Sequence, residues 1–113
     1  EKIERDRVLD IVGTQPKQFK LTLYSIFNCA KGDEQIFTGE IYDFYKDACY
    51  KTGTKPLTQR RVSDIIAELD MLGIINARVI SKGRYGRTRE ISLAIPNSSV
   101  DELKKTLETS LAI

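Results

Sequence analysis

Apolar side chains recur every three to four positions through the first two thirds of the chain, which is the spacing of one face of an α-helix. The pattern predicts four successive helices, which cover residues 3–12, 16–30, 38–52 and 58–72. Pro16 is expected at the first position of the second helix, where its missing N–H costs nothing. Thr38 and Thr58 are expected to be the N-caps of the third and fourth helices. Gly53 and Gly73 are expected to end them, because glycine readily adopts the left-handed conformation found after a helix.

The core-facing positions of the last three of these helices are expected to be Phe19, Leu23, Ile26, Phe27 and Ala30; Ile41, Phe44, Tyr45, Ala48 and Cys49; and Val62, Ile65, Ile66, Leu69 and Leu72. After Gly73 the apolar period changes to two, which is typical of half-buried strands. The expected inward positions there are Ile75, Ala77 and Val79 in one strand, and Ile91, Leu93 and Ile95 in the other. Gly83 and Gly86 supply the backbone freedom that a hairpin between the strands requires.

A last helix is expected over residues 99–111, with Ser99 and Glu102 as a capping box and Leu103, Leu107 and Leu111 facing inward. The order of three helices, two strands and flanking helices predicts a mainly α fold with a small β-hairpin. This fold is a winged helix-turn-helix with additional N- and C-terminal helices. Residues 1–14 would form a connecting helix, residues 16–95 the winged-helix core and residues 99–111 the C-terminal helix of one domain. The alternative is a helical bundle that carries a decorative hairpin.

Charge is distributed unevenly along the 113 residues, although the net charge is only +2. Residues 57–89 contain seven basic and three acidic side chains, whereas the rest of the chain contains 11 basic and 13 acidic ones. A basic segment within a nearly neutral chain indicates a surface for nucleic acid. A solvated charged face is the alternative explanation.

The predicted DNA-binding residues are Thr58, Gln59, Arg60, Arg61 and Ser63 at the start of the fourth helix, and Lys82, Gly83, Arg84, Tyr85, Gly86, Arg87 and Arg89 in and beside the hairpin. A helix N-terminus in a helix-turn-helix brings its first residues to base edges. Arginine can pair bidentately with guanine and glutamine with adenine, or either can hold phosphates. On a helical wheel, Arg60 points directly away from the apolar stripe, and Arg61 lies nearer the side, where a phosphate is the expected partner. In the hairpin, glycines allow close approach to DNA, and an arginine can enter the minor groove. Tyr85 either packs on a sugar or phosphate or folds back onto the strands.

Catalytic and metal chemistry have little support in the sequence. Histidine is absent, and no glycine-rich phosphate loop, GxSxG motif or CxxC pair occurs. Cys29 and Cys49 are expected to be small core residues, with a disulfide between them as the alternative. No enzyme activity, metal or cofactor is therefore expected of this chain.

The stretches Pro56–Ala77 and Ser81–Thr88 resemble the C-terminal winged-helix domain of archaeal replication initiators, which belong to the AAA+ family. These initiators are homologues of the largest subunit of the eukaryotic origin recognition complex and of its helicase-loading relative. The resemblance implies binding of double-stranded origin DNA, with the fourth helix in the major groove and the hairpin at the minor groove. It also implies an AAA+ domain outside this chain that would use ATP and Mg²⁺. The replicative helicase or other initiator subunits would be partners, without any membrane, in a cytoplasmic, chromosome-associated protein of an archaeal cell.

Two other functions fit the predicted fold. A winged-helix transcription regulator would dimerise through a terminal helix, for which Leu103, Leu107 and Leu111 are candidates. A winged-helix protein-interaction module would bind DNA no better than its net charge predicts, and the basic hairpin speaks against that function.

Overall fold

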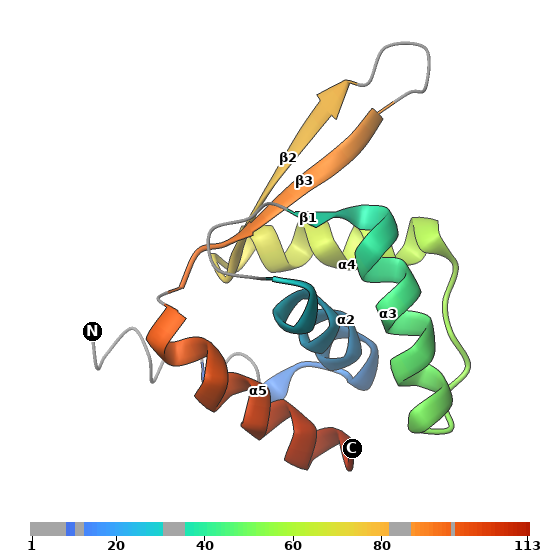
Figure 1. Ribbon diagram of the computed structural model, residues 1–113, viewed down its shortest axis with the longest axis vertical. Coiled ribbons are helices and arrows are strands. Elements are labelled where there is room, and N and C mark those ends of the chain that lie inside the picture. Colours follow the sequence, from blue (N-terminus) through green and yellow to red (C-terminus); the bar gives the residue numbers. More distant parts are fainter. Residues whose placement is uncertain (1–8, 11–12, 31–35, 82–86, 96) are drawn as a thin grey trace.

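The computed structural model describes residues 9–10, 13–30, 36–81, 87–95 and 97–113, and confirms the predicted winged helix-turn-helix (Figure 1). Its elements are α2 (Lys17–Cys29), β1 (Ile36–Phe37), α3 (Thr38–Lys51), α4 (Gln59–Met71), β2 (Ile75–Ser81), β3 (Arg87–Leu93) and α5 (Asn97–Leu111). Helices α2, α3 and α4 pack around one core, α5 covers α2 from the other side, and the β2–β3 ribbon projects away from the helices (Figure 1).

Helix α2 is the centre of the core and is buried on more of its surface than the periodicity predicts. Every side chain from Leu21 to Phe27 is buried, because α3, α4 and α5 all pack against this helix. The hydroxyl of Thr22 donates to the carbonyl of Gln18 at 2.9 Å, and that of Ser25 donates to the carbonyl of Leu21 at 2.7 Å. These bonds within the helix satisfy polar groups that burial would otherwise penalise.

The predicted inner faces of α3 and α4 are confirmed, and so are the signals that bound α4. Thr58 is the N-cap, and its hydroxyl accepts a hydrogen bond from the N–H of Arg61 at 3.3 Å. After the helix, Gly73 has a φ of +83°, and the N–H of Ile74 donates to the carbonyl of Leu69 at 3.3 Å. With the bond from Gly73 to Asp70, this is the Schellman arrangement that satisfies the last carbonyls of a helix. Gly53 follows α3 with a φ of +67°, as predicted.

The start of α3 differs from the prediction. Phe37, not Thr38, occupies the N-cap position, because Ile36 and Phe37 form a short strand that the sequence pattern does not reveal. The carboxylate of Glu40 accepts a hydrogen bond from the N–H of Phe37 at 3.4 Å. Thr38 is instead the buried first residue of the helix, and its hydroxyl donates to the carbonyl of Arg89 at 3.5 Å.

Three other predicted boundaries are also corrected. Gly13 and Thr14 are helical, although the first helix was expected to stop before them. Pro16 is the N-cap residue of α2, one position before the expected one. Helix α5 begins at Asn97, so Ser99 lies within the helix and is not its cap.

The sheet has three antiparallel strands in the order β1-β3-β2, with Ile36 opposite Ile91 and Ile75 opposite Leu93. Ile91 is completely buried, so the hairpin is anchored in the core and is not decorative. The prediction that Val79 faces inward fails in part, because the strands extend beyond the helices and leave this side chain 53% exposed.

Helix α5 packs on α2 through Leu103, Leu107 and Leu111, all of which are buried within this single chain. Lys20 on α2 donates to the hydroxyl of Ser110 on α5 at 2.8 Å. The leucines are therefore already used inside the fold, which removes the basis for dimerisation through them. Among the described residues, no helix combines the length and apolar character that crossing a bilayer demands.

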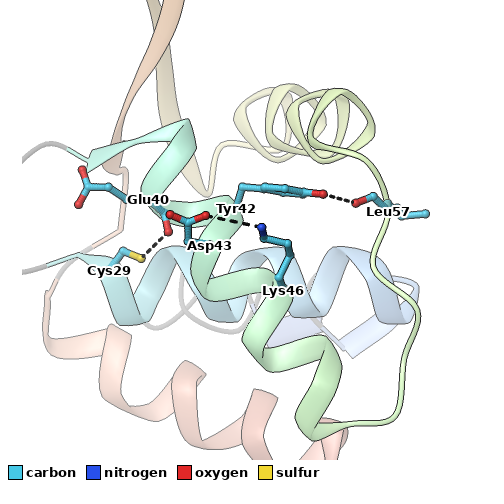
Figure 2. Close-up of polar contacts among 6 residues, drawn as sticks. All are labelled: Cys29, Glu40, Tyr42, Asp43, Lys46 and Leu57. Carbon is cyan, nitrogen blue, oxygen red and sulfur yellow. Dashed lines mark hydrogen bonds and ion pairs between the residues drawn. The ribbon is translucent and has the colours of Figure 1, made fainter.

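Both cysteines are free thiols, as predicted for core residues. Cys49 is buried in α3, and burial raises the pKa of its thiol. Cys29 is half-buried at the end of α2, and its thiol donates to the carbonyl of Glu40 at 3.8 Å (Figure 2).

Candidate nucleic-acid interface

The outward face of α4 presents the basic side chains that the sequence predicts. Gln59, Arg60 and Arg61 are exposed in its first turn, and Asp64 is exposed one turn later. No side chain of these four forms a hydrogen bond or an ion pair with any other residue that the structure describes. Two guanidinium groups at a helix N-terminus, which carries a partial positive charge, form a site that favours anions.

The chain just before α4 is held by two tyrosines of α3. The Tyr45 hydroxyl accepts a hydrogen bond from the N–H of Leu57 at 2.8 Å and donates to Oε1 of Gln18 at 2.5 Å. The Tyr42 hydroxyl donates to the carbonyl of Leu57 at 2.9 Å (Figure 2). The N–H and the carbonyl of Leu57, the residue before the N-cap, are therefore both hydrogen-bonded to tyrosines of α3.

Other side chains support these two tyrosines and the turn. The rings of Tyr42 and Tyr45 stack with their centroids 5.9 Å apart, and the ammonium group of Lys46 lies 5.0 Å from the Tyr42 ring. Gln18 on α2 also donates through Nε2 to the carbonyl of Lys55 in the turn, at 3.4 Å. Tyr45 is completely buried, and burial raises the pKa of its hydroxyl to about 12. The hydroxyl thus remains protonated and able to donate at neutral pH.

The predicted site residues fall into three groups in the structure. Thr58, Gln59, Arg60 and Arg61 lie together at the start of α4, and Ser63 is half-buried on its flank. Arg87 lies in β3 opposite Ser81, and the segment 82–86, which contains Lys82, Gly83, Arg84, Tyr85 and Gly86, is outside the described residues. Arg89 lies in β3 and donates through Nη1 to the main-chain carbonyl of Ser63.

Sequence reasoning missed the residues that hold the site in place. Tyr42, Tyr45 and Gln18 carry no nucleic-acid signal, since Tyr45 fits the predicted apolar stripe of α3, Tyr42 is an uncharged residue beside it and the glutamine belongs to another helix. It also missed the ion pair across the hairpin, in which Nη2 of Arg78 lies 2.8 Å from Oε1 of Glu90. Antiparallel register alone could have suggested this pair, because the two residues are directly opposite each other.

Comparison with known proteins gives concordant results. A family model described as the C-terminal winged helix domain of CDC6 matches residues 10–103. The ORC1-type DNA replication protein 1 of Methanosarcina mazei is 52% identical over 110 residues, which are 95% of this chain and 26% of that protein. The ORC1-type DNA replication protein 7 of Halobacterium salinarum is 53% identical over 109 residues, which are 96% of this chain and 20% of that protein.

A solved structure, that of the Aeropyrum pernix ORC1 protein in complex with DNA, matches with a TM-score of 0.83 and 48% identity. The match covers 93% of this chain and 28% of that one. The chain therefore spans only about a quarter of the length of these relatives. With a family model matched over most of its length and relatives above half identity, the chain belongs to the family of CDC6 C-terminal winged helix domains.

Proposed function

We propose that this chain is a double-stranded DNA-binding module in which the first two turns of α4 enter the major groove. The basic hairpin between β2 and β3 lies at the adjacent minor groove. The observation that carries the proposal is the exposed pair Arg60 and Arg61, which has no partner among the described residues and lies on a helix start fixed by Tyr42 and Tyr45. The match to an ORC1 protein solved in complex with DNA supports it.

The proposed role is sequence-dependent binding at replication origins, as the C-terminal domain of an archaeal initiator. The support is that the relatives are ORC1-type DNA replication proteins of which this chain spans about a quarter. The rest of such a protein would carry an AAA+ domain with ATP and Mg²⁺, and contacts with the replicative helicase or other initiator subunits. The protein would be associated with the chromosome of an archaeal cell.

The two arginines have different expected partners. Arg60 points away from the core and can form two hydrogen bonds with a guanine edge, a contact that discriminates against other bases by about 1–3 kcal/mol. Arg61 lies nearer the side of α4, where it would bind phosphate and contribute affinity without sequence preference. If four to six phosphates are contacted in all, the logarithm of affinity falls with the logarithm of salt with a slope of roughly −4 to −5.

A fluorescence-anisotropy titration at about 0.15 M salt, near physiological ionic strength, tests the proposal. It compares a duplex that carries an archaeal origin repeat with a shuffled duplex of equal length. The expected result is a preference above about tenfold, or about 1.4 kcal/mol, which Arg60→Ala abolishes. Arg78→Ala is the matched control, because Arg78 is 74% exposed but lies on the sheet, paired with Glu90. Equal affinity of the wild type for both duplexes would refute sequence-dependent binding, and equal losses on both duplexes for Arg60→Ala would refute its base contact.

A further inference from the structure

Arg89 joins the hairpin to both helices of the helix-turn-helix. It is partly buried in β3, and its Nη1 donates a hydrogen bond to the main-chain carbonyl of Ser63 in the second turn of α4. Its own carbonyl accepts a hydrogen bond from the hydroxyl of Thr38, the first residue of α3, at 3.5 Å. Arg89 thus contacts α4, the proposed recognition helix, through its side chain, and α3 through its backbone.

The position of Arg89 along β3 is where the hairpin leaves the body of the protein. Residues directly opposite each other in an antiparallel pair share a face of the sheet, so Arg89 lies on the same face as Val79 and, two residues on, Ile91. Ile91 is completely buried, whereas Val79 is 53% exposed. The inner face of the ribbon therefore passes from buried to exposed at Arg89. The β2–β3 ribbon as a whole projects from the helices (Figure 1).

The hydrogen bond between Arg89 and Ser63 is chemically suited to hold β3 in a fixed orientation against α4. A hydrogen bond from a charged donor is about twice as strong as one between neutral groups. The planar guanidinium also loses less conformational freedom than a lysine side chain would in making it. Arg60 and Arg61 differ, since both are exposed and have no partner among the described residues. For Arg89 to bind a phosphate through Nη1, it would have to release the carbonyl of Ser63.

We propose that Arg89 is a positioning residue, which holds β3 against α4 and so sets the angle between the recognition helix and the hairpin. This inference rests on the proposed function, in which α4 and the hairpin contact one duplex. Two linked contacts reinforce each other only when their geometry allows both to form at once. A positioning role for Arg89 differs from the direct DNA contact that the sequence predicts.

The test is a set of DNA titrations in two backgrounds, wild type and a variant with the hairpin charges removed by Lys82→Ala, Arg84→Ala and Arg87→Ala. Arg89→Met removes the hydrogen bond and the charge but keeps the unbranched stem. Arg78→Met is the matched control, because it removes one charge from the neighbouring strand without a bond to α4. The probe is a labelled duplex that carries an archaeal origin repeat, titrated at several salt concentrations.

With the hairpin charges present, Arg89→Met is expected to weaken binding about tenfold more than Arg78→Met, because the hairpin no longer lies where both contacts can form. In the hairpin-neutralised background the two variants should bind alike. If Arg89 instead contacts phosphate directly, its loss is the same in both backgrounds, and the salt slope becomes shallower by about 0.9. That outcome would overturn the inference while leaving the proposed function intact. Failure of the wild type to bind the duplex would instead overturn the proposed function.

A second measurement uses only the wild-type protein, so it does not depend on whether a variant folds. In ¹⁵N-labelled wild-type protein, the guanidinium protons of Arg89 should exchange slowly with water before DNA is added, and their chemical shifts should change little on saturation with the duplex. Fast exchange in the free protein, or a large shift on adding DNA, would show that the guanidinium is not held by Ser63 and would refute its positioning role.

Discussion

The hydroxyl of Tyr45 offers the sharpest test of how the recognition helix is held. Tyr45→Phe keeps the ring, which is completely buried, so no cavity forms. The substitution removes the acceptor of the Leu57 N–H at 2.8 Å and the donor to Gln18. A donor left unsatisfied in this way costs about 1–3 kcal/mol. We therefore expect the free energy of unfolding to fall by about 2 kcal/mol, which for a domain of this length lowers Tm by about 8 °C.

The assay is urea unfolding followed by far-UV circular dichroism, with Tyr50→Phe as the matched control. Tyr50 is on the same helix but is 79% exposed, so loss of its hydroxyl should change stability by less than about 0.5 kcal/mol. If Tyr45→Phe is as stable as Tyr50→Phe, the hydroxyl does not hold the turn before α4, and the account of how the helix start is fixed would be wrong.

The pH dependence of the free energy of unfolding, compared between wild type and Tyr45→Phe, gives an independent check. Burial raises the pKa of Tyr45 from 10.0 to about 12, so between these values the unfolded chain loses the proton and the folded chain keeps it. Stability falls with rising pH wherever the folded state binds more protons than the unfolded state. The advantage of wild type over Tyr45→Phe should therefore be fully present below about pH 10 and shrink as pH approaches about 12, the folded pKa. A constant difference across this window would contradict the burial of a protonated hydroxyl.

Two further substitutions test the surface and the core. Arg61→Ala should weaken binding to origin and shuffled duplexes alike and make the salt slope shallower by about 0.9; an unchanged slope in anisotropy titrations would exclude a phosphate contact. Leu107→Ala should lower the free energy of unfolding by about 2–5 kcal/mol, because the side chain is completely buried between α5 and α2. If sedimentation instead showed a dimer that this variant dissociates without loss of stability, Leu107 would be an interface residue.

The features that sequence predicts correctly are those whose causes lie within a few residues. Thr58 caps α4 through a bond to Arg61, three residues away, and Gly73 ends it through bonds that span at most five residues. Both signals are complete in one stretch of chain, so no knowledge of the tertiary structure is needed. The same holds for the alternation that predicts β2 and β3.

The predictions that failed depend on partners distant in the chain. Thr38 looks like a cap, but Phe37 is drawn into a strand opposite Glu90, and this moves the helix start by one residue. Seven consecutive residues of α2, Leu21 to Phe27, are buried, because three helices pack against it, and a single apolar stripe cannot anticipate that. The bond from Arg89 to Ser63 also joins residues 26 apart, so a count of basic residues does not show which arginine is hydrogen-bonded within the fold; the DNA contact predicted for Arg89 stays a prediction.

The difference between arginines that are bonded within the fold and arginines that are exposed determines how much of the basic segment is available to DNA. Of the seven basic residues between 57 and 89, Arg78 is paired with Glu90 and Arg89 with the carbonyl of Ser63, whereas Arg60 and Arg61 have no partner among the described residues. If Arg78 and Arg89 contact no phosphate, at most five of the seven can do so, and the salt slope of this segment should be no steeper than about −4.5; contacts by all seven would give about −6. An arginine without an internal partner exchanges only its hydration for a phosphate, whereas one that is already bonded must first give up that bond. The affinity of the domain should therefore follow the charges that the fold leaves unpaired, and its geometry should follow those that the fold has paired.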